Sequence, residues 1–179
     1  PLDEGVLRLD GEAVRFSSPH AAQTAGVSSV YQEIDLLPNL TVAENIVLGR
    51  EPRRWGRIDW RRARQQARDA MAGLGLDIDP ASQLGSHSLA VQQLVAIARA
   101  ISADVRVLVL DEPTSSLDSD ECAELFRVVR DLQGTGVAIL FVSHFLDQVY
   151  EISDRITVLR DGRLVGEYLT PELLRIDLV

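Results

Sequence analysis

The apolar and polar positions of the chain repeat with two periods, one typical of strands and the other of helices. Short apolar runs that end in polar residues predict strands over 27–32, 107–111 and 137–144. Apolar positions three or four residues apart predict helices over about 59–74, 86–102, 119–132 and 146–152. In the 59–74 helix the predicted packing stripe consists of Ala63, Ala67, Ala70, Met71 and Leu74.

Turn and capping residues place the ends of several elements. Asp10-Gly11 and Asp161-Gly162 each separate two short strand patterns, which predicts two hairpins. Ser18 is a typical helix cap, and Gly26 ends the short helix that Ser18 begins. Thr41 with Glu44 three residues later forms the pattern of a capping box, so a helix is expected to begin there.

The order of these elements indicates the fold class. Strands and helices alternate, which predicts an α/β fold with a mainly parallel sheet and an antiparallel hairpin at the amino end. The stretch from about 40 to 100 is expected to be a helical insert. With 179 residues, the chain is long enough for one domain, so residues 1–179 are interpreted as a single unit.

The composition narrows the possible settings. Apolar residues make up 46% and charged residues 25%, and the formal net charge of −9 argues against a nucleic-acid-binding surface. The longest apolar run, Val137 to Val142, is far shorter than the roughly 20 residues of a membrane-spanning helix. The single cysteine, Cys122, and the absence of a leader-like start favour a reducing cytoplasm. Cys122 lies near a helix start, but a structural role is expected for it because no histidine is close in sequence.

Residues 50–68 carry eight arginines against two acidic residues, in contrast to the acidic remainder of the chain. One interpretation is a solvated helix face, with the arginines exposed because burial of unpaired guanidinium groups is prohibitive. The other is a docking surface for an acidic partner or for anionic lipid headgroups.

Chemistry is concentrated in the stretch "VLVLDEPTSSLDSDE", residues 107–121. Its apolar strand delivers Asp111 and Glu112 to a sheet edge, where carboxylates suit Mg²⁺ and a water molecule. Four further features accompany this pair in sequence. They are Gln32 at the end of the first strand, Ser88 at the front of a helix, the turn Ser116-Leu117-Asp118, and His144 after "VAILFVS".

With these five features in order, the chain resembles the nucleotide-binding domain of ABC transporters over nearly its whole length. Gln32 matches the family's Q-loop, "HSLAV" its signature, "VLVLDE" its Walker B strand, "SSLD" its D-loop and His144 its H-loop. The segment "VYQEIDLLPNLTVAENIVLGRE" is similar to the corresponding segment in the first cassette of ribose-, galactose- and xylose-type sugar importers. The resemblance implies a P-loop NTPase-like fold.

The resemblance also implies roles, with ATP and Mg²⁺ as cofactors. Glu112 would be the general base and His144 the group that senses the γ-phosphate, although His144 alone also fits a strand cap. Asp111 and Gln32 would serve the metal. The expected nucleotide-contacting residues are Gln32, Ser88, Ala90, Ser116 and Asp118. The signature keeps only its serine and lacks the glycines that allow close backbone approach, so a plain helix cap at Ser86 or Ser88 stays open.

The expected partners are a membrane permease and a second cassette in a head-to-tail dimer, at the cytoplasmic face of the bacterial inner membrane. No nucleic acid is expected, and any membrane contact would run through the permease. A P-loop requires Gly-x-x-x-x-Gly-Lys-Ser/Thr, yet the chain contains no lysine, so that loop and its strand are expected upstream. Two alternatives remain: a non-catalytic cassette that serves binding or assembly, and a soluble ABC protein of DNA repair or translation.

Overall fold

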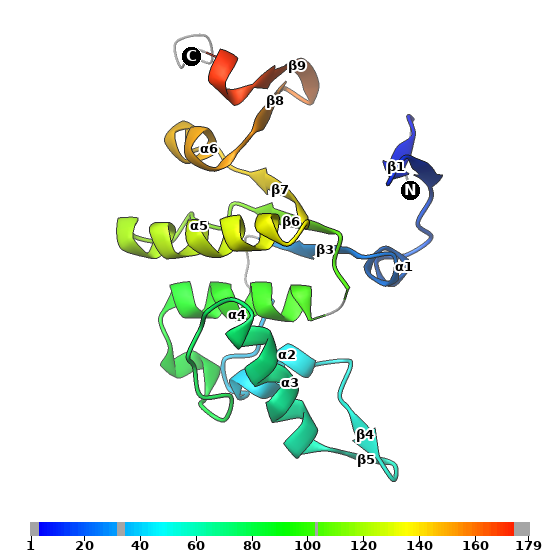
Figure 1. The fold of residues 1–179 in the computed structure, drawn as a ribbon, viewed down its shortest axis with the longest axis vertical. Coiled ribbons are helices and arrows are strands. Elements are labelled where there is room, and N and C mark those ends of the chain that lie inside the picture. Colours follow the sequence, from blue (N-terminus) through cyan, green and yellow to red (C-terminus); the bar gives the residue numbers. More distant parts are fainter. Residues whose placement is uncertain (1–3, 32–34, 103, 174–179) are drawn as a thin grey trace.

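A three-stranded parallel sheet forms the centre of the protein (Figure 1). The computed structural model describes residues 4–31, 35–102 and 104–173. The strands are β3 (Val27–Val30), β6 (Val107–Asp111) and β7 (Ala138–Val142), in the order β3-β6-β7. The predicted α/β class with a parallel sheet is therefore confirmed.

The segment before the sheet follows its local sequence signals. β1 (Leu7–Leu9) and β2 (Glu12–Val14) pair as the predicted hairpin, with positive φ at both Asp10 and Gly11. Helix α1 (Pro19–Thr24) begins after Ser18, whose hydroxyl accepts a hydrogen bond from the Ala21 amide. It leads through Gly26, also at positive φ, into β3.

Three helices pack together below the sheet (Figure 1). They are α2 (Val42–Val47), α3 (Trp60–Ala72) and α4 (Leu89–Ile101), with a single 3-10 turn at Leu84–Ser86. Helix α4 is the one that contacts β3, while α2 and α3 pack against α4. The Thr41–Glu44 capping box is present at the start of α2. In the stripe of α3, Ala63, Ala67 and Met71 are fully buried, while Ala70 is half-buried. All eight arginines of residues 50–68 are exposed, as expected.

Sequence patterns missed one element inside this region. β4 (Arg53–Arg54) and β5 (Arg57–Ile58) pair as a short antiparallel hairpin between α2 and α3. Its turn, Trp55-Gly56, begins with a residue that is not a turn signal, whereas the predicted turns begin with aspartate.

The carboxyl-terminal part of the chain contains the last strand of the parallel sheet, two helices and a separate hairpin. Helix α5 (Ser119–Gly134) packs against β7, and the rings of Phe126 and Phe141 meet edge to face with centroids 6.0 Å apart. Helix α6 (Leu146–Ile152) precedes the predicted hairpin of β8 (Arg155–Arg160) and β9 (Arg163–Leu169), and a 3-10 turn spans Thr170–Glu172. Within the described ranges, no helix has both the length and the apolar character needed to cross a bilayer.

Strand β7 lies at an edge of the sheet in the described part of the chain. It pairs with β6, whereas β8 pairs with β9 in a separate two-stranded sheet. Leu140 and Val142 are 56% and 41% exposed. Because side chains alternate between the two faces of a strand, these two exposed residues lie on the same face of β7, which the described residues leave uncovered.

Candidate functional site

The carboxylate of Glu112 and the imidazole of His144 meet at the carboxyl edge of the sheet. The β6–β7 register pairs Asp111 with Val142, and the Glu112 amide donates to the Val142 carbonyl at 2.9 Å. His144 follows this strand end by two residues, and its Nδ1 lies 2.8 Å from Glu112 Oε1. Parallel pairing of two strands thus joins residues that are 32 positions apart in sequence.

Glu112 adopts an unusual backbone conformation. Its φ of +47° lies in the left-handed region, and among the described non-glycine residues with positive φ it alone stands outside a two-residue hairpin turn. The side chain is 17% exposed, and its Oε2 atom is buried without a hydrogen-bond partner among the described residues. A strained residue with a free acceptor atom is typical of a functional site.

The side chain of His144, unlike that of Glu112, is mostly exposed to solvent. Its side chain is 68% exposed and its ring lies against Phe145, with centroids 4.1 Å apart. An ionised Glu112 only accepts hydrogen bonds, so Nδ1 carries the proton in this contact and Nε2 is the nitrogen available to a further group.

The loop after Glu112 is anchored to α5 and α6. The Thr114 side chain is buried and its hydroxyl donates to Gln148 Oε1 at 2.5 Å. Ser116 is exposed. Asp118 caps α5, where its Oδ1 accepts from the amides of Asp120 and Glu121 at 3.0 and 2.9 Å. Asp118 therefore has a local role in helix capping besides any role toward a nucleotide.

The signature residues lie at the amino end of α4. Ser88 is exposed and caps the helix, with its Oγ accepting from the Val91 amide at 3.4 Å. Ala90 is only 8% exposed, so its methyl group packs inward and only its backbone can serve a ligand. No hydrogen bond joins Ser88 to the Glu112–His144 pair in the described ranges.

Gln32, expected at both the nucleotide and the metal, lies outside the described residues. Tyr31 directly before it is 61% exposed.

Cys122 lies below this loop, where Gln148 Nε2 donates to its Sγ at 3.8 Å. Burial raises the pKa of the Cys122 thiol, and the nearby carboxylates of Asp118 and Glu121 raise it further. A thiol that resists ionisation is a poor nucleophile, which agrees with the structural role expected for it.

Neither Thr114 nor Gln148 was singled out from the sequence, because their contact depends on how α6 packs on the loop.

Comparison with known proteins decides the family. A sequence profile described as "ABC transporter" matches residues 1–115, more than half of the chain. The chain belongs to the ABC transporter family. The Glu112–His144 contact joins the two residues that the sequence resemblance assigns to the Walker B strand and to the H-loop.

Two curated relatives of this ABC-family chain are named as ATP-binding proteins of sugar transport. It is 48% identical over 179 residues to the fructose import ATP-binding protein FruK of Bifidobacterium longum. It is also 48% identical over 177 residues to the galactofuranose transporter ATP-binding protein YtfR of Escherichia coli strain K12. Each alignment covers 99% of this chain, which spans only 35% of the length of either relative.

Solved structures show the same cassette fold. A nucleotide-free ATP-binding cassette from an ABC transporter superposes with a TM-score of 0.81 at 22% identity, over 93% of this chain and 70% of that one. The dimeric post-hydrolysis state of MJ0796 bound to ADP and Pi superposes with a TM-score of 0.74 at 23% identity, over 94% and 74%. The predicted P-loop NTPase-like fold is therefore confirmed.

The residues present fit one half of an ATP site. Asp111 offers a hard oxygen ligand that suits Mg²⁺. The unpartnered Glu112 Oε2 is an acceptor for a water molecule. The phosphate-binding half does not fit, because the 179 residues contain no lysine and thus no P-loop of the required pattern.

Proposed function

We propose that this protein is part of the ATPase subunit of a bacterial sugar importer of the ABC type, where ATP hydrolysis drives transport. The observation that carries the proposal is the contact between Glu112 Oε1 and His144 Nδ1, with Glu112 Oε2 left buried and unpartnered among the described residues. The 48% identity to two sugar-import ATP-binding proteins supports the substrate class.

Each residue of the pair has a physical role in this proposal. Glu112 Oε2 accepts the proton of a water molecule that attacks the terminal phosphate, while the hydrogen bond from His144 fixes the orientation of the carboxylate. Asp111 would hold Mg²⁺ when it is bound, and the metal would supply positive charge at the phosphates. Bound Mg²⁺-ATP would supply the phosphate that is cleaved and the charge that balances these carboxylates. These 179 residues contain no P-loop pattern that could form the phosphate cradle.

Other surfaces are assigned to partners in the same proposal. The exposed Ser88, at the amino end of α4, faces the nucleotide of a second cassette in a head-to-tail dimer. Ser116 and Asp118 lie in the loop that meets this second cassette. Residues 40–100 form a helical subdomain that contacts a membrane permease, which places the protein at the cytoplasmic face of the inner membrane. Gln32 would connect that contact to the metal.

The test is Glu112→Gln in the complete subunit, followed by nucleotide binding and phosphate release. Binding should persist while hydrolysis falls by roughly 10²-fold or more, as expected for loss of a general base. Glu12→Gln, which removes an exposed carboxylate from the amino-terminal hairpin, should leave both unchanged. Near-normal turnover of the Glu112→Gln protein would remove Glu112 from this role.

A further inference from the structure

The β4–β5 hairpin extends away from the helices on either side of it (Figure 1). Its strands are only two residues long, and Trp55 at the turn is 90% exposed. The hairpin residues 53–58 include three arginines, Arg53, Arg54 and Arg57, all of which are exposed. The tip of the hairpin is therefore a large aromatic ring beside three positive charges.

Folding does not account for tryptophan at this position. The described chain has three two-residue hairpin turns with positive φ at both residues, and their first residues are Asp10, Trp55 and Asp161. Aspartate tolerates the left-handed conformation, whereas a bulky side chain there is an outlier. Trp55 (φ +55°) is thus strained and also leaves its ring in water. Strain at an exposed aromatic residue indicates a partner for that residue.

Among the described residues the arginines of the hairpin form no side-chain hydrogen bond, although the pKa of the nearby Glu51 is lowered first by its backbone hydrogen bonds and then by the charge of Arg53. Arg53, Arg54 and Arg57 form no ion pair there, in contrast to Arg127 and Arg130 of α5. The two acidic residues of this segment are used by the backbone. Glu51 accepts from the Gly49 amide at 3.0 Å and Asp59 caps α3 by accepting from the Arg62 amide at 3.1 Å.

We propose that the β4–β5 hairpin docks on an anionic lipid bilayer, with Trp55 in the headgroup region and Arg53, Arg54 and Arg57 on lipid phosphates. An indole ring has an apolar body and a polar N–H, which suits the boundary between headgroups and acyl chains. Guanidinium groups bind phosphate with paired hydrogen bonds. A protruding tip also fits a flat, deformable surface. The contact goes beyond the proposed function, because it is direct and does not run through a permease.

The test follows Trp55 fluorescence on vesicles. Trp60 is the only other tryptophan, so Trp60→Phe leaves Trp55 as the single reporter. On phosphatidylcholine vesicles that contain phosphatidylglycerol, Trp55 emission should shift to the blue and be quenched by brominated acyl chains. Vesicles of phosphatidylcholine alone should produce neither change.

Two variants and one control distinguish binding through the β4–β5 hairpin from attraction of the vesicles by the protein's arginines in general. Joint replacement of Arg53, Arg54 and Arg57 by glutamine should weaken vesicle binding by about 100-fold. Trp55→Asn, which suits the left-handed turn and should fold at least as well, should still bind but release faster. Glutamine at Arg155, Arg160 and Arg163 removes the same charge from the β8–β9 hairpin and should leave binding nearly unchanged.

Equal loss in both triple variants would overturn the proposal, since it would show attraction by net charge alone. Displacement of the protein from vesicles by millimolar inorganic phosphate would point to a free anion as the ligand and would also contradict it. Binding of a polyglutamate peptide in preference to vesicles would identify an acidic protein partner instead. The proposed ATPase function is unaffected by any of these results, because Glu112 and His144 are not altered.

Discussion

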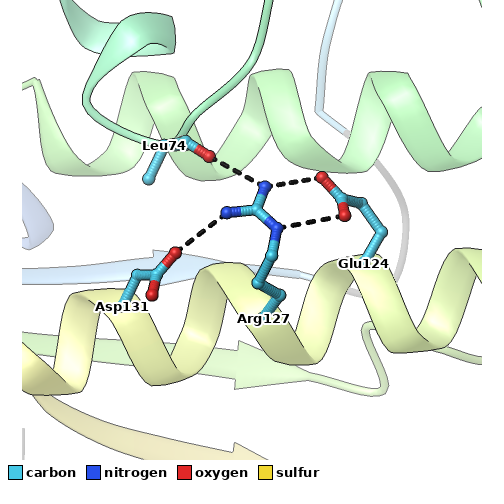
Figure 2. Close-up of polar contacts among 4 residues, drawn as sticks. All are labelled: Leu74, Glu124, Arg127 and Asp131. Atoms are coloured by element: carbon cyan, nitrogen blue, oxygen red, sulfur yellow. Dashed lines mark hydrogen bonds and ion pairs between the residues drawn. The ribbon is translucent and has the colours of Figure 1, made fainter.

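Arg127 of α5 donates a hydrogen bond from Nη2 to the backbone carbonyl of Leu74, 3.1 Å away, in the segment that follows α3 (Figure 2). Glu124 and Asp131, on the same helix, hold the guanidinium from either side at 2.6 and 2.9 Å. Gly75 next to this contact has φ +70°, and a Cβ there would lie 3.2 Å from Arg127 Nη1. Besides apolar packing, the helix beside β7 is therefore joined to the segment after α3 by an oriented polar side chain.

We predict that Arg127→Gln loosens this junction without unfolding the protein. The end of α3 loses its bond to α5, so amide hydrogen exchange over residues 73–76 should accelerate, with a loss of about 1 kcal/mol in the free energy of unfolding. Arg130→Gln is the matched control, because Arg130 lies on the same helix but pairs with Glu151 at 3.0 Å. Unchanged exchange over 73–76 in the Arg127 variant would contradict a linking role.

Replacement of His144 tests its positioning of Glu112. In the complete subunit, His144→Ala should lower kcat on the order of 10²-fold while nucleotide affinity changes little, since a misplaced base loses its alignment. His144→Gln keeps an amide donor and should restore part of the rate. A His144→Ala effect confined to KM would show that the residue binds nucleotide and does not orient Glu112.

The 179-residue chain by itself should neither bind Mg²⁺-ATP tightly nor hydrolyse it. Asp111 and Glu112 would face the negative phosphates without the backbone cradle and lysine of a P-loop. Calorimetric titration and a phosphate-release assay measure this directly, with the complete subunit measured beside the 179-residue chain. Micromolar affinity with turnover in the short chain would require a phosphate site that its sequence does not show.

The stabilisation that Glu44 provides at the start of α2 depends on pH. The pKa of Glu44 is lowered from 4.5, first because the Thr41 amide donates to its carboxylate at 2.7 Å and also because the Thr41 hydroxyl does. A lowered pKa in the folded state means that this stabilisation is complete above the ordinary carboxyl pKa. It is lost as the pH falls through the lower, folded-state value.

We therefore expect Glu44→Gln to destabilise the protein by about 0.5 kcal/mol at neutral pH, and by less as the pH falls below 4.5. Urea unfolding at a series of pH values measures the difference between the two proteins. Glu12→Gln, at an exposed position of β2, should match the unsubstituted chain throughout. A Glu44 difference that stays constant into acid would show that the carboxylate charge has no part in the cap.

Much of the fold was predictable from the sequence because its signals are local. Thr41 with Glu44 specifies a helix start through atoms three residues apart, and Asp10-Gly11 specifies a hairpin through two backbone conformations. The apolar run that ends at Asp111 likewise predicts a buried strand and the carboxylates after it. These features depend on neighbours along the chain, so the sequence alone determined them.

The tertiary structure decided what depends on distant segments. Glu112 and His144 meet only because β6 and β7 pair in parallel with Asp111 beside Val142, and no local pattern sets that register. The inward packing of Ala90 depends on the layer beneath α4. The β4–β5 hairpin escaped prediction because Trp55 occupies a turn position that aspartate, asparagine or glycine normally marks. Local sequence patterns do not specify which distant strands pair. They also do not predict a turn at a residue such as Trp55, whose side chain disfavours the left-handed backbone conformation that it adopts.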